Sequence, residues 1–350
     1  MQHPKVTPTL KAHSEMGKKQ ITLQVFLTIA LLLTICVAML LGRYTISFEK
    51  LYHAIWVRLT QPDSVENSVE YNVIFQLRLP RILLAALSGM ALSVAGAVLQ
   101  GIFRNPLVGP SMIGVSSGAA FGAVSAIFMA LSGIAIMACS FVGGVLSLLF
   151  TMSIAGKVGS KNILAIILGG IVTGALFSAL VSVVTFVADP RDTLPVIVYW
   201  LMGSFSGADA NKVLLLGTVC LICFAVIFKS RYVINLLALG DEEAYALGVD
   251  VVRLRILFLA LTTLLTAATV SVSGTIGWVG LVVPHIARMI TGNDYRSLVV
   301  TSALIGGIYL VLADTLVRIS PYGEIPIGIL SALVGAPVLA YLLHTRKVSN

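Results

Sequence analysis

Residues 81–156 read RILLAALSGMALSVAGAVLQGIFRNPLVGPSMIGVSSGAAFGAVSAIFMALSGIAIMACSFVGGVLSLLFTMSIAG and contain only two charged side chains, Arg81 and Arg104. A helix of about 20 mostly apolar residues crosses the roughly 30 Å hydrocarbon core of a bilayer. The stretch is long enough for three such helices, with Ser132-Gly133 as the natural turn between the last two. Because backbone polar groups in lipid must bond internally, these spans are expected to be helices of an integral membrane protein.

The composition of the whole chain is also typical of a membrane protein. Of its 350 residues, 58% are hydrophobic and 11% are charged, and the mean hydropathy is +0.99. Soluble domains carry about 25% charged residues. The net charge of +8 could suit nucleic acid, but the basic residues form short clusters between apolar runs, without the interleaved aromatic residues that stack on bases. Lipid is therefore the expected solvent.

Ten spans are predicted in an all-α, polytopic fold. The apolar run Ile21–Leu41 is too long for the core of a cleaved signal peptide, about 7–15 residues, and is taken as the first span. With the N-terminus in the cytoplasm, most basic residues fall on inner segments, as the positive-inside rule requires. The organisation is a cytoplasmic tail 1–20, a transmembrane domain 21–344 and a cytoplasmic tail 345–350. The spans lie at about 21–42, 81–101, two within 105–156, 162–187, 212–228, 255–273, 276–291, 298–318 and 325–343.

Two outer loops carry further structure. In residues 43–80, Phe48, Leu51, Ile55 and Leu59 recur at helical spacing, which predicts a short amphipathic helix at the membrane interface. In the loop 188–211, the apolar stretch 195–202 is too short to span and is expected to fold back against the bundle. No convincing sequence repeat is visible, although a structural repeat between spans two to five and seven to ten is possible.

The segment Gln100–Pro110 at the inner end of the second span holds two prolines and two glycines, which prevent a simple helical turn. Irregular backbone at membrane depth persists only where protein or water satisfies its polar groups, as in a pathway gate. An ordinary cytoplasmic turn is the alternative interpretation.

The inner segment 239–250, LGDEEAYALGVD, predicts a two-turn helix. Asp241 can cap its N-terminus, and Glu242 is favourable in its first turn. Gly248 can end it in a left-handed conformation, and Ala244 and Leu247 are expected on one face. Such an element can dock as a rigid peg into a partner protein, or it can be a capped loop helix without a partner.

Two further motifs carry polar groups. GTIGWVGLVVPHIAR, residues 274–288, is interpreted as a broken helix entry, in which a structural role for His285 is favoured over that of a ligand or proton relay. Asp314 and Arg318 are four residues apart and can pair on one helix face. Arg78, Arg81 and Arg318 fall at the outer surface, where unpaired arginines would suit an acidic partner.

Several kinds of site are not expected in this chain. No GxxxxGK[ST] phosphate loop exists, so if this chain takes part in ATP-driven transport, another subunit would have to supply the hydrolysis. Cys220 and Cys223 are interpreted as small side chains of a membrane helix, since no second pair or nearby histidine completes a zinc set. No catalytic residue, metal site or cofactor is predicted.

Five segments together resemble the FecCD family of permeases, which serve iron-siderophore, haem and vitamin B12 importers. They are RLPRILLAALSGMALSVAGAVLQGIFRNPLVGPSMIGVSSGAA, YWLMGSFSG, LALGDEEAYALGVDV, GTIGWVGLVVPHIARMI and GEIPIGILSALVGAPVLAYLL. The resemblance implies a type II ABC importer permease in the cytoplasmic (inner) membrane. It also implies a second copy or close homologue, two subunits that use ATP and Mg, and an extracytoplasmic substrate-binding protein.

The resemblance also implies roles for single residues. The ATPase-coupling segment matches Leu239, Gly240, Asp241, Glu242, Ala244, Leu247 and Gly248. The arginines that would receive acidic residues of the binding protein match Arg78, Arg81 and Arg318. The gate and translocation path match Gln100, Asn105, Pro106, Leu107, Gly109 and Pro110. A second gate segment would fall near Gly159–Asn162, where this sequence matches poorly.

The family resemblance allows several cargoes. An iron-siderophore complex is the expected substrate, because it is the commonest cargo of the family, and haem, cobalamin and molybdate remain open. Two other classes compete. An ion-driven secondary transporter should carry ionisable residues in mid-membrane, and a membrane-embedded enzyme should cluster His, Asp or Glu at one depth. The spans show few of the former and no such cluster.

Overall fold

The computed structural model describes residues 7–60, 69–159, 163–320 and 323–347, and no strand occurs in these ranges. The second gate segment near Gly159–Asn162 therefore lies largely outside the described residues. The helices are α1 (Thr7–Leu40), α2 (Phe48–Thr60), α3 (Val69–Asn72), a π-helical turn (Val73–Arg78), α4 (Leu79–Ile102), a 3-10 turn (Pro110–Ile113), α5 (Val115–Phe128), α6 (Gly133–Gly159), α7 (Ile163–Val187), α8 (Thr193–Leu201), α9 (Ala210–Leu239), α10 (Asp241–Ala246), α11 (Val251–Ser273), α12 (Val279–Thr291), α13 (Tyr295–Ile319) and α14 (Ile327–Lys347).

The all-α membrane fold predicted from the sequence is confirmed. Within the described ranges, seven helical stretches are long and apolar enough to cross a bilayer. They are α1, α3–α4, α6, α7, α9, α11 and α13. The other three predicted spans correspond to shorter apolar helices, α5, α12 and residues 327–341 of α14. The sixth span was predicted to end near residue 228, but α9 continues to Leu239, because hydropathy marks where lipid ends and not where the helix ends.

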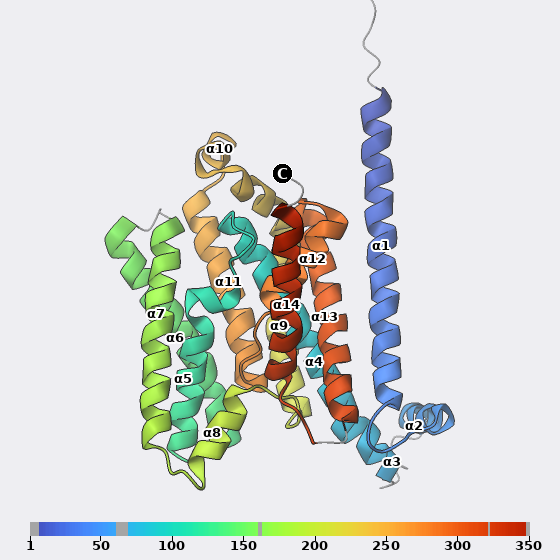
Figure 1. Ribbon diagram of the computed structural model, residues 1–350. Coiled ribbons are helices and arrows are strands. Elements are labelled where there is room, and N and C mark those ends of the chain that lie inside the picture. Colours follow the sequence, from blue (N-terminus) through green and yellow to red (C-terminus); the bar gives the residue numbers. More distant parts are fainter. Residues whose placement is uncertain (1–6, 61–68, 160–162, 321–322, 348–350) are drawn as a thin grey trace, which may run out of the picture.

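Figure 1 shows α10, the start of α1 and the end of α14 at one end of the bundle, and α2, α3 and α8 at the other. We name these the inner and outer ends, following the sequence prediction that α10 is cytoplasmic. The stretch 195–202 folds back as expected, since Ile197 of α8 is fully buried against Val124 and Ile127 of α5. Helix α2 forms as predicted, but Leu51 is buried whereas Phe48 and Ile55 are exposed, so these three predicted residues do not share one buried face.

Two groups of four helices, α4–α7 and α11–α14, have the same order and opposite directions (Figure 1). Each begins with a long helix, continues through an irregular segment into a short helix, and ends with two long helices. The packing of the two groups corresponds too. The first helix of each group contacts the third helix of the other, in the pairs α4–α13 and α11–α6. The second helix of each group contacts the first helix of the other, in the pairs α5–α11 and α12–α4. The groups therefore form an inverted structural repeat, a frequent plan of membrane transporters.

Glycines let the two halves meet backbone to backbone. A Cβ atom at Gly96 of α4 would lie 1.7 Å from the carbonyl oxygen of Gly280 in α12, and one at Gly89 would lie 2.0 Å from that of Gly306 in α13. Small residues at such crossings allow membrane helices to approach closely and gain dispersion contacts.

Gly96→Ala is expected to destabilise the chain by about 1–3 kcal/mol, because the added methyl group forces α4 away from α12. Gly156→Ala is the matched control, since a Cβ there would meet nothing within 4 Å. The measurement is the thermal unfolding midpoint of the purified protein in detergent. Equal midpoints for the two variants would contradict the packing argument.

Candidate functional site

The inner end carries α10 as a short projecting helix (Figure 1). Gly240 and Gly248 bound it with φ angles of +153° and +79°, a region that favours glycine. The predicted left-handed end at Gly248 is therefore present. Ala244 is fully buried beneath the helix, whereas Leu239, Tyr245 and Leu247 are exposed. The prediction that Ala244 and Leu247 share a face is wrong, because Leu247 lies at the C-cap, where helical spacing no longer applies.

Asp241 anchors α10 but does not cap it. The N-cap position belongs to Gly240, and no side-chain capping bond forms there. The Asp241 carboxylate instead accepts a hydrogen bond of 2.7 Å from Arg255 of α11 and lies 3.4 Å from the Arg104 guanidinium. The Arg255 side chain is almost fully buried, and a buried charge without a counter-charge costs more free energy than an uncapped helix end. Glu242 remains exposed at the surface of α10.

The segment after α4 leads from the inner end back into the bundle. Arg104 adopts a left-handed φ of +52°, and a side-chain oxygen of Asn105 accepts a hydrogen bond from the Leu107 backbone N–H at 2.9 Å. The chain then reaches Gly280 of α12, against which Pro110 packs, before Gly114 turns it into α5. The irregular backbone predicted here is therefore present, and it makes α5 a short helix that begins inside the bundle.

An inner cavity of about 410 Å³ opens beside this segment. Gln100 lines it: its side-chain amide nitrogen donates to the Leu281 carbonyl at 3.3 Å, and its side-chain oxygen accepts from Arg288 at 3.0 Å. Of the predicted gate residues, Gln100, Asn105 and Pro106 line the cavity, Leu107 is exposed nearby, and Gly109 and Pro110 lie deeper against α12. The other lining residues are Arg104, Asn235, Ala238, Leu239, Arg288, Asn293 and Tyr295.

A second interruption lies between α11 and α12. Gly274 and Trp278 take left-handed φ angles of +70° and +68°, as a broken helix entry requires. Ser273 accepts at its carbonyl a hydrogen bond of 2.8 Å from the Ser204 backbone, and the Thr275 hydroxyl donates to the Leu201 carbonyl. His285, about two turns further along the chain in α12, is buried. No group of three or more His, Cys, Asp or Glu side chains that could hold a metal ion occurs among the described residues.

The outer end gathers three buried arginines. Arg81 of α4 donates hydrogen bonds to Asp314 of α13 at 2.9 Å and to Glu324 at 3.0 Å. Arg78 donates to the carbonyl oxygens of Met39, Leu40 and Tyr44. The interpretation of the three arginines as unpaired surface groups is therefore wrong for Arg81 and Arg78. The sequence predicted a pair between Asp314 and Arg318, but Asp314 forms its ion pair with Arg81. The close packing of α4 on α13 brings Arg81 to Asp314.

Arg318 differs from its neighbours. Its side chain is only 7% exposed and donates one hydrogen bond, to the Ala38 carbonyl at 2.6 Å. Its Nε and Nη1 atoms are buried without a partner among the described residues. An outer cavity of about 270 Å³ adjoins it, lined also by Arg43, Arg78, Arg81 and Glu324. A buried, unsatisfied guanidinium is costly, so this cluster favours an added anionic group.

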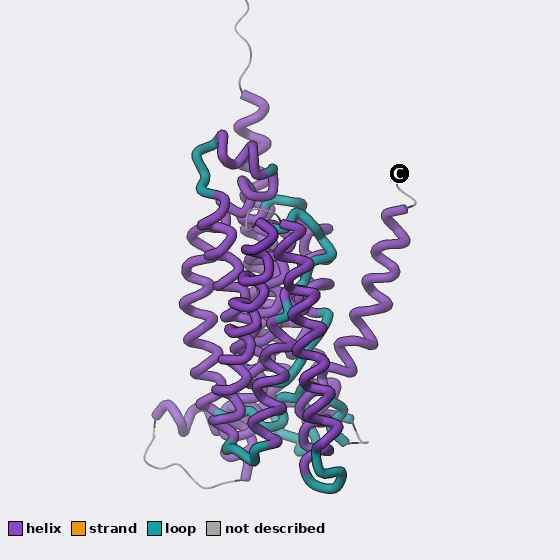
Figure 2. Tube along the Cα trace, turned by 90° about the vertical axis from the view of Figure 1, so that its left-hand side faces the viewer, coloured by secondary structure: helices purple, strands orange, loops and turns teal. Residues whose placement is uncertain are grey.

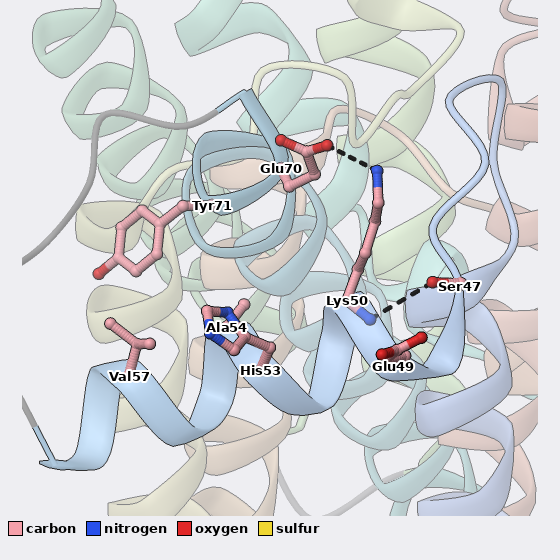
Figure 3. Close-up of a pocket in the computed structure, with 8 residues that line it drawn as sticks. All are labelled: Ser47, Glu49, Lys50, His53, Ala54, Val57, Glu70 and Tyr71. Atoms are coloured by element: carbon pink, nitrogen blue, oxygen red, sulfur yellow. Dashed lines mark hydrogen bonds and ion pairs between the residues drawn. The ribbon is translucent and has the colours of Figure 1, made fainter.

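A further outer cavity of about 460 Å³ lies between α2 and α3 (Figure 3). Its polar feature is an ion pair in which Lys50 of α2 reaches across to Glu70 at 2.8 Å. The hydrogen bond from the ammonium group to that carboxylate raises the pKa of Lys50. The pair is largely exposed and ties α2 to α3.

Comparison with known proteins gives consistent matches. The model of the FecCD transport family matches residues 30–345. The molybdate import permease MolB of Haemophilus influenzae is 42% identical over 92% of this chain and 95% of its own. A probable iron chelatin permease of Helicobacter pylori is 41% identical over 79% of this chain and 84% of its own. A solved structure, described as the inward-facing conformation of an ABC transporter assigned to the metal-chelate type, has a TM-score of 0.83 at 38% identity, covering 93% of this chain and 99% of that one.

Proposed function

This chain belongs to the FecCD transport family and is the membrane-spanning permease of an ABC importer, and we propose that its cargo is an iron chelate. The observation that carries the permease function is the arrangement of the inverted repeat. The interrupted segments between α4 and α5 and between α11 and α12 meet inside the bundle. They lie between the exposed helix α10 at the inner end and the outer arginines, of which Arg318 has donor atoms without a partner among the described residues. A permease that alternates its access needs such elements on both sides of a movable centre.

We assign α10 the coupling role. Leu239, Tyr245 and Leu247 give it an exposed apolar surface, and the Asp241–Arg255 ion pair fixes it to α11. A partner ATPase that binds ATP and Mg and closes would push on α10, and the push would reach α11 and then the Gly274–Trp278 interruption. The inner cavity beside Gln100 and Asn105 would open or close in response.

We assign the outer arginine cluster to docking of an extracytoplasmic binding protein. Arg318 has two donor atoms, Nε and Nη1, without a partner among the described residues. Arg81, in contrast, already forms an ion pair with Glu324. An acidic side chain of the binding protein would satisfy Arg318 at the outer cavity. Since Glu324 lies three residues before α14, docking at this cluster would also act on the start of that helix.

A second copy of the chain, or a close homologue, is proposed to complete the path. Figure 2 shows α14 leaning away from the other helices. Its side chains Leu333, Val334 and Tyr341 are exposed on a helix that carries few polar groups. An exposed apolar helix beside a glycine-rich bundle suits a dimer interface or a path wall more than water. With α10 inside, both chain ends would be cytoplasmic.

The competing classes receive less support. Among the described residues, the buried ion pairs lie toward the ends of the bundle, Arg81–Asp314 at the outer end and Arg255–Asp241 at the inner end. A proton- or sodium-driven carrier would be expected to place such groups at mid-depth. An embedded enzyme would need a cluster of His, Asp or Glu, and the described residues hold none that could bind a metal.

Molybdate is the second candidate cargo. It is favoured by the match to MolB, which extends over 92% of this chain, whereas the match to the iron chelatin permease covers 79%. Haem and cobalamin are further possibilities for this family. The deciding experiment is competitive uptake into proteoliposomes that contain the complete importer.

Uptake of labelled ferric siderophore is expected to be ATP-dependent and to be unaffected by excess molybdate, haem or cobalamin. If molybdate abolishes uptake or is itself accumulated, the cargo is an oxyanion and the iron proposal fails. Uptake without an ATPase subunit would contradict the whole function.

A further inference from the structure

A polar crevice of about 630 Å³ opens at the inner end between α1, the end of α9 and the turn that joins α12 to α13. We name it the α1 crevice. Its polar side chains come from three separate parts of the sequence; none belongs to α10, and of these residues only Asn293 also lines the inner cavity. The charged and amide side chains among them are Gln20, Gln24, Arg231, Asn293, Asp294 and Arg296.

The depth of the α1 crevice matches the phosphate level of the inner leaflet. The apolar run of α1 begins at Ile21, which itself lines the crevice. The apolar part of α9 ends at Phe228, directly before Lys229, and that of α13 begins at Leu298. All three helices therefore pass from hydrocarbon to water at this level, where lipid headgroups lie.

The charges of the crevice favour an anion. Its one carboxylate, Asp294, already accepts hydrogen bonds from Arg296 at 3.0 Å and from Asn235 at 2.8 Å. Burial alone would raise the pKa of Asp294, but these hydrogen bonds hold it below the ordinary value, so the group stays ionised and engaged. Arg231 forms no ion pair among the described residues, and Lys18 and Lys19 are exposed on the adjoining turn of α1.

Neutral donors complete the set. The side-chain amides of Gln20, Gln24 and Asn293 line the crevice, and none of them takes part in a hydrogen bond within the described part of the chain. A phosphodiester offers several acceptor oxygens and one negative charge, which suits two guanidinium groups and amides around a single engaged carboxylate. Basic pockets between helices on the cytoplasmic side can bind acidic headgroups in this way.

We propose that the α1 crevice binds the phosphate of an anionic phospholipid of the inner leaflet, with Arg231 as its principal ligand. In Figure 1, α1 and α10 lie on opposite sides of the inner end, so an ATPase seated on α10 leaves the crevice open to lipid. Helix α1 packs mainly on α13. A lipid held between α1, α9 and the α12–α13 turn would fasten this peripheral helix to the bundle.

The test is lipid binding to the full-length chain, purified in a neutral detergent and stripped of lipid. Phosphatidylglycerol is the probe and phosphatidylcholine the reference, with native mass spectrometry to measure retained lipid and thermal unfolding to measure stabilisation. Phosphatidylglycerol is expected to bind and to raise the midpoint more than phosphatidylcholine does. Arg231→Gln is expected to weaken its apparent affinity about fivefold, the effect of one surface arginine on an anionic lipid.

Lys229→Gln is the matched control, because it also removes one positive charge. Lys229 lies two residues before Arg231, and its side chain is exposed and does not line the crevice. Its phosphatidylglycerol response should equal that of the unmodified chain. An equal loss in both variants, or no preference for phosphatidylglycerol, would overturn the proposal. If inorganic phosphate or glycerol 3-phosphate alone reproduces the full stabilisation, the crevice is a site for a free anion and the lipid assignment is wrong.

Discussion

Leu247→Asp is expected to lower cargo uptake at least tenfold while the partner ATPase still hydrolyses ATP. Leu247 is 60% exposed at the tip of α10, next to exposed Tyr245. Burying a leucine in a partner surface contributes about 1.5–3 kcal/mol, and a carboxylate in the same contact must also be desolvated. A loss of about 1.4 kcal/mol of binding free energy already weakens the contact between α10 and the ATPase tenfold, so the ATPase should no longer move α10.

The measurement is uptake and ATP hydrolysis in the same proteoliposomes, so that uncoupling is distinguished from loss of assembly. Leu247→Met is the control, since it keeps an apolar side chain of similar volume and should retain most uptake. Normal uptake by Leu247→Asp would show that α10 does not carry the coupling.

Removing the Arg81 side chain is expected to destabilise the permease by about 3–5 kcal/mol, the usual cost of breaking a buried ion pair from one side. Arg81→Ala leaves Asp314, almost fully buried, without its counter-charge. The double variant Arg81→Met, Asp314→Leu should recover most of the loss, because no buried charge of this pair remains. Thermal unfolding in detergent measures both.

Lys50→Ala serves as the control for the Arg81 series. It breaks the exposed Lys50–Glu70 pair on the same outer side and should hardly change the midpoint, since water screens that pair. If Arg81→Ala behaves like Lys50→Ala, the outer ion pairs do not support the fold. A docking experiment is better made with Arg318→Gln, because reversal of Arg81 to Glu would disturb the fold and the docking surface together.

Parts of the candidate site could be predicted because they depend on local backbone chemistry. The turn at Gly248 and the interruption at Gly274 need glycine conformations, and glycines at the right spacing announce them. Which groups pair across helices could not be predicted in this way. Asp241 was expected to cap its own helix and Asp314 to pair with Arg318, yet both carboxylates meet arginines from other helices, Arg255 and Arg81.

The sequence by itself determined that lipid is the main solvent, that the fold is helical and which family the chain belongs to, because hydropathy, charge placement and turn residues act over a few neighbouring positions. Only the tertiary structure decided the inverted repeat, the burial of the outer arginines and the α1 crevice. These features join residues far apart in the chain, such as Gln24, Arg231 and Arg296. Their free energies come from helix packing and desolvation, which depend on which helices meet and leave no periodic signal in the sequence.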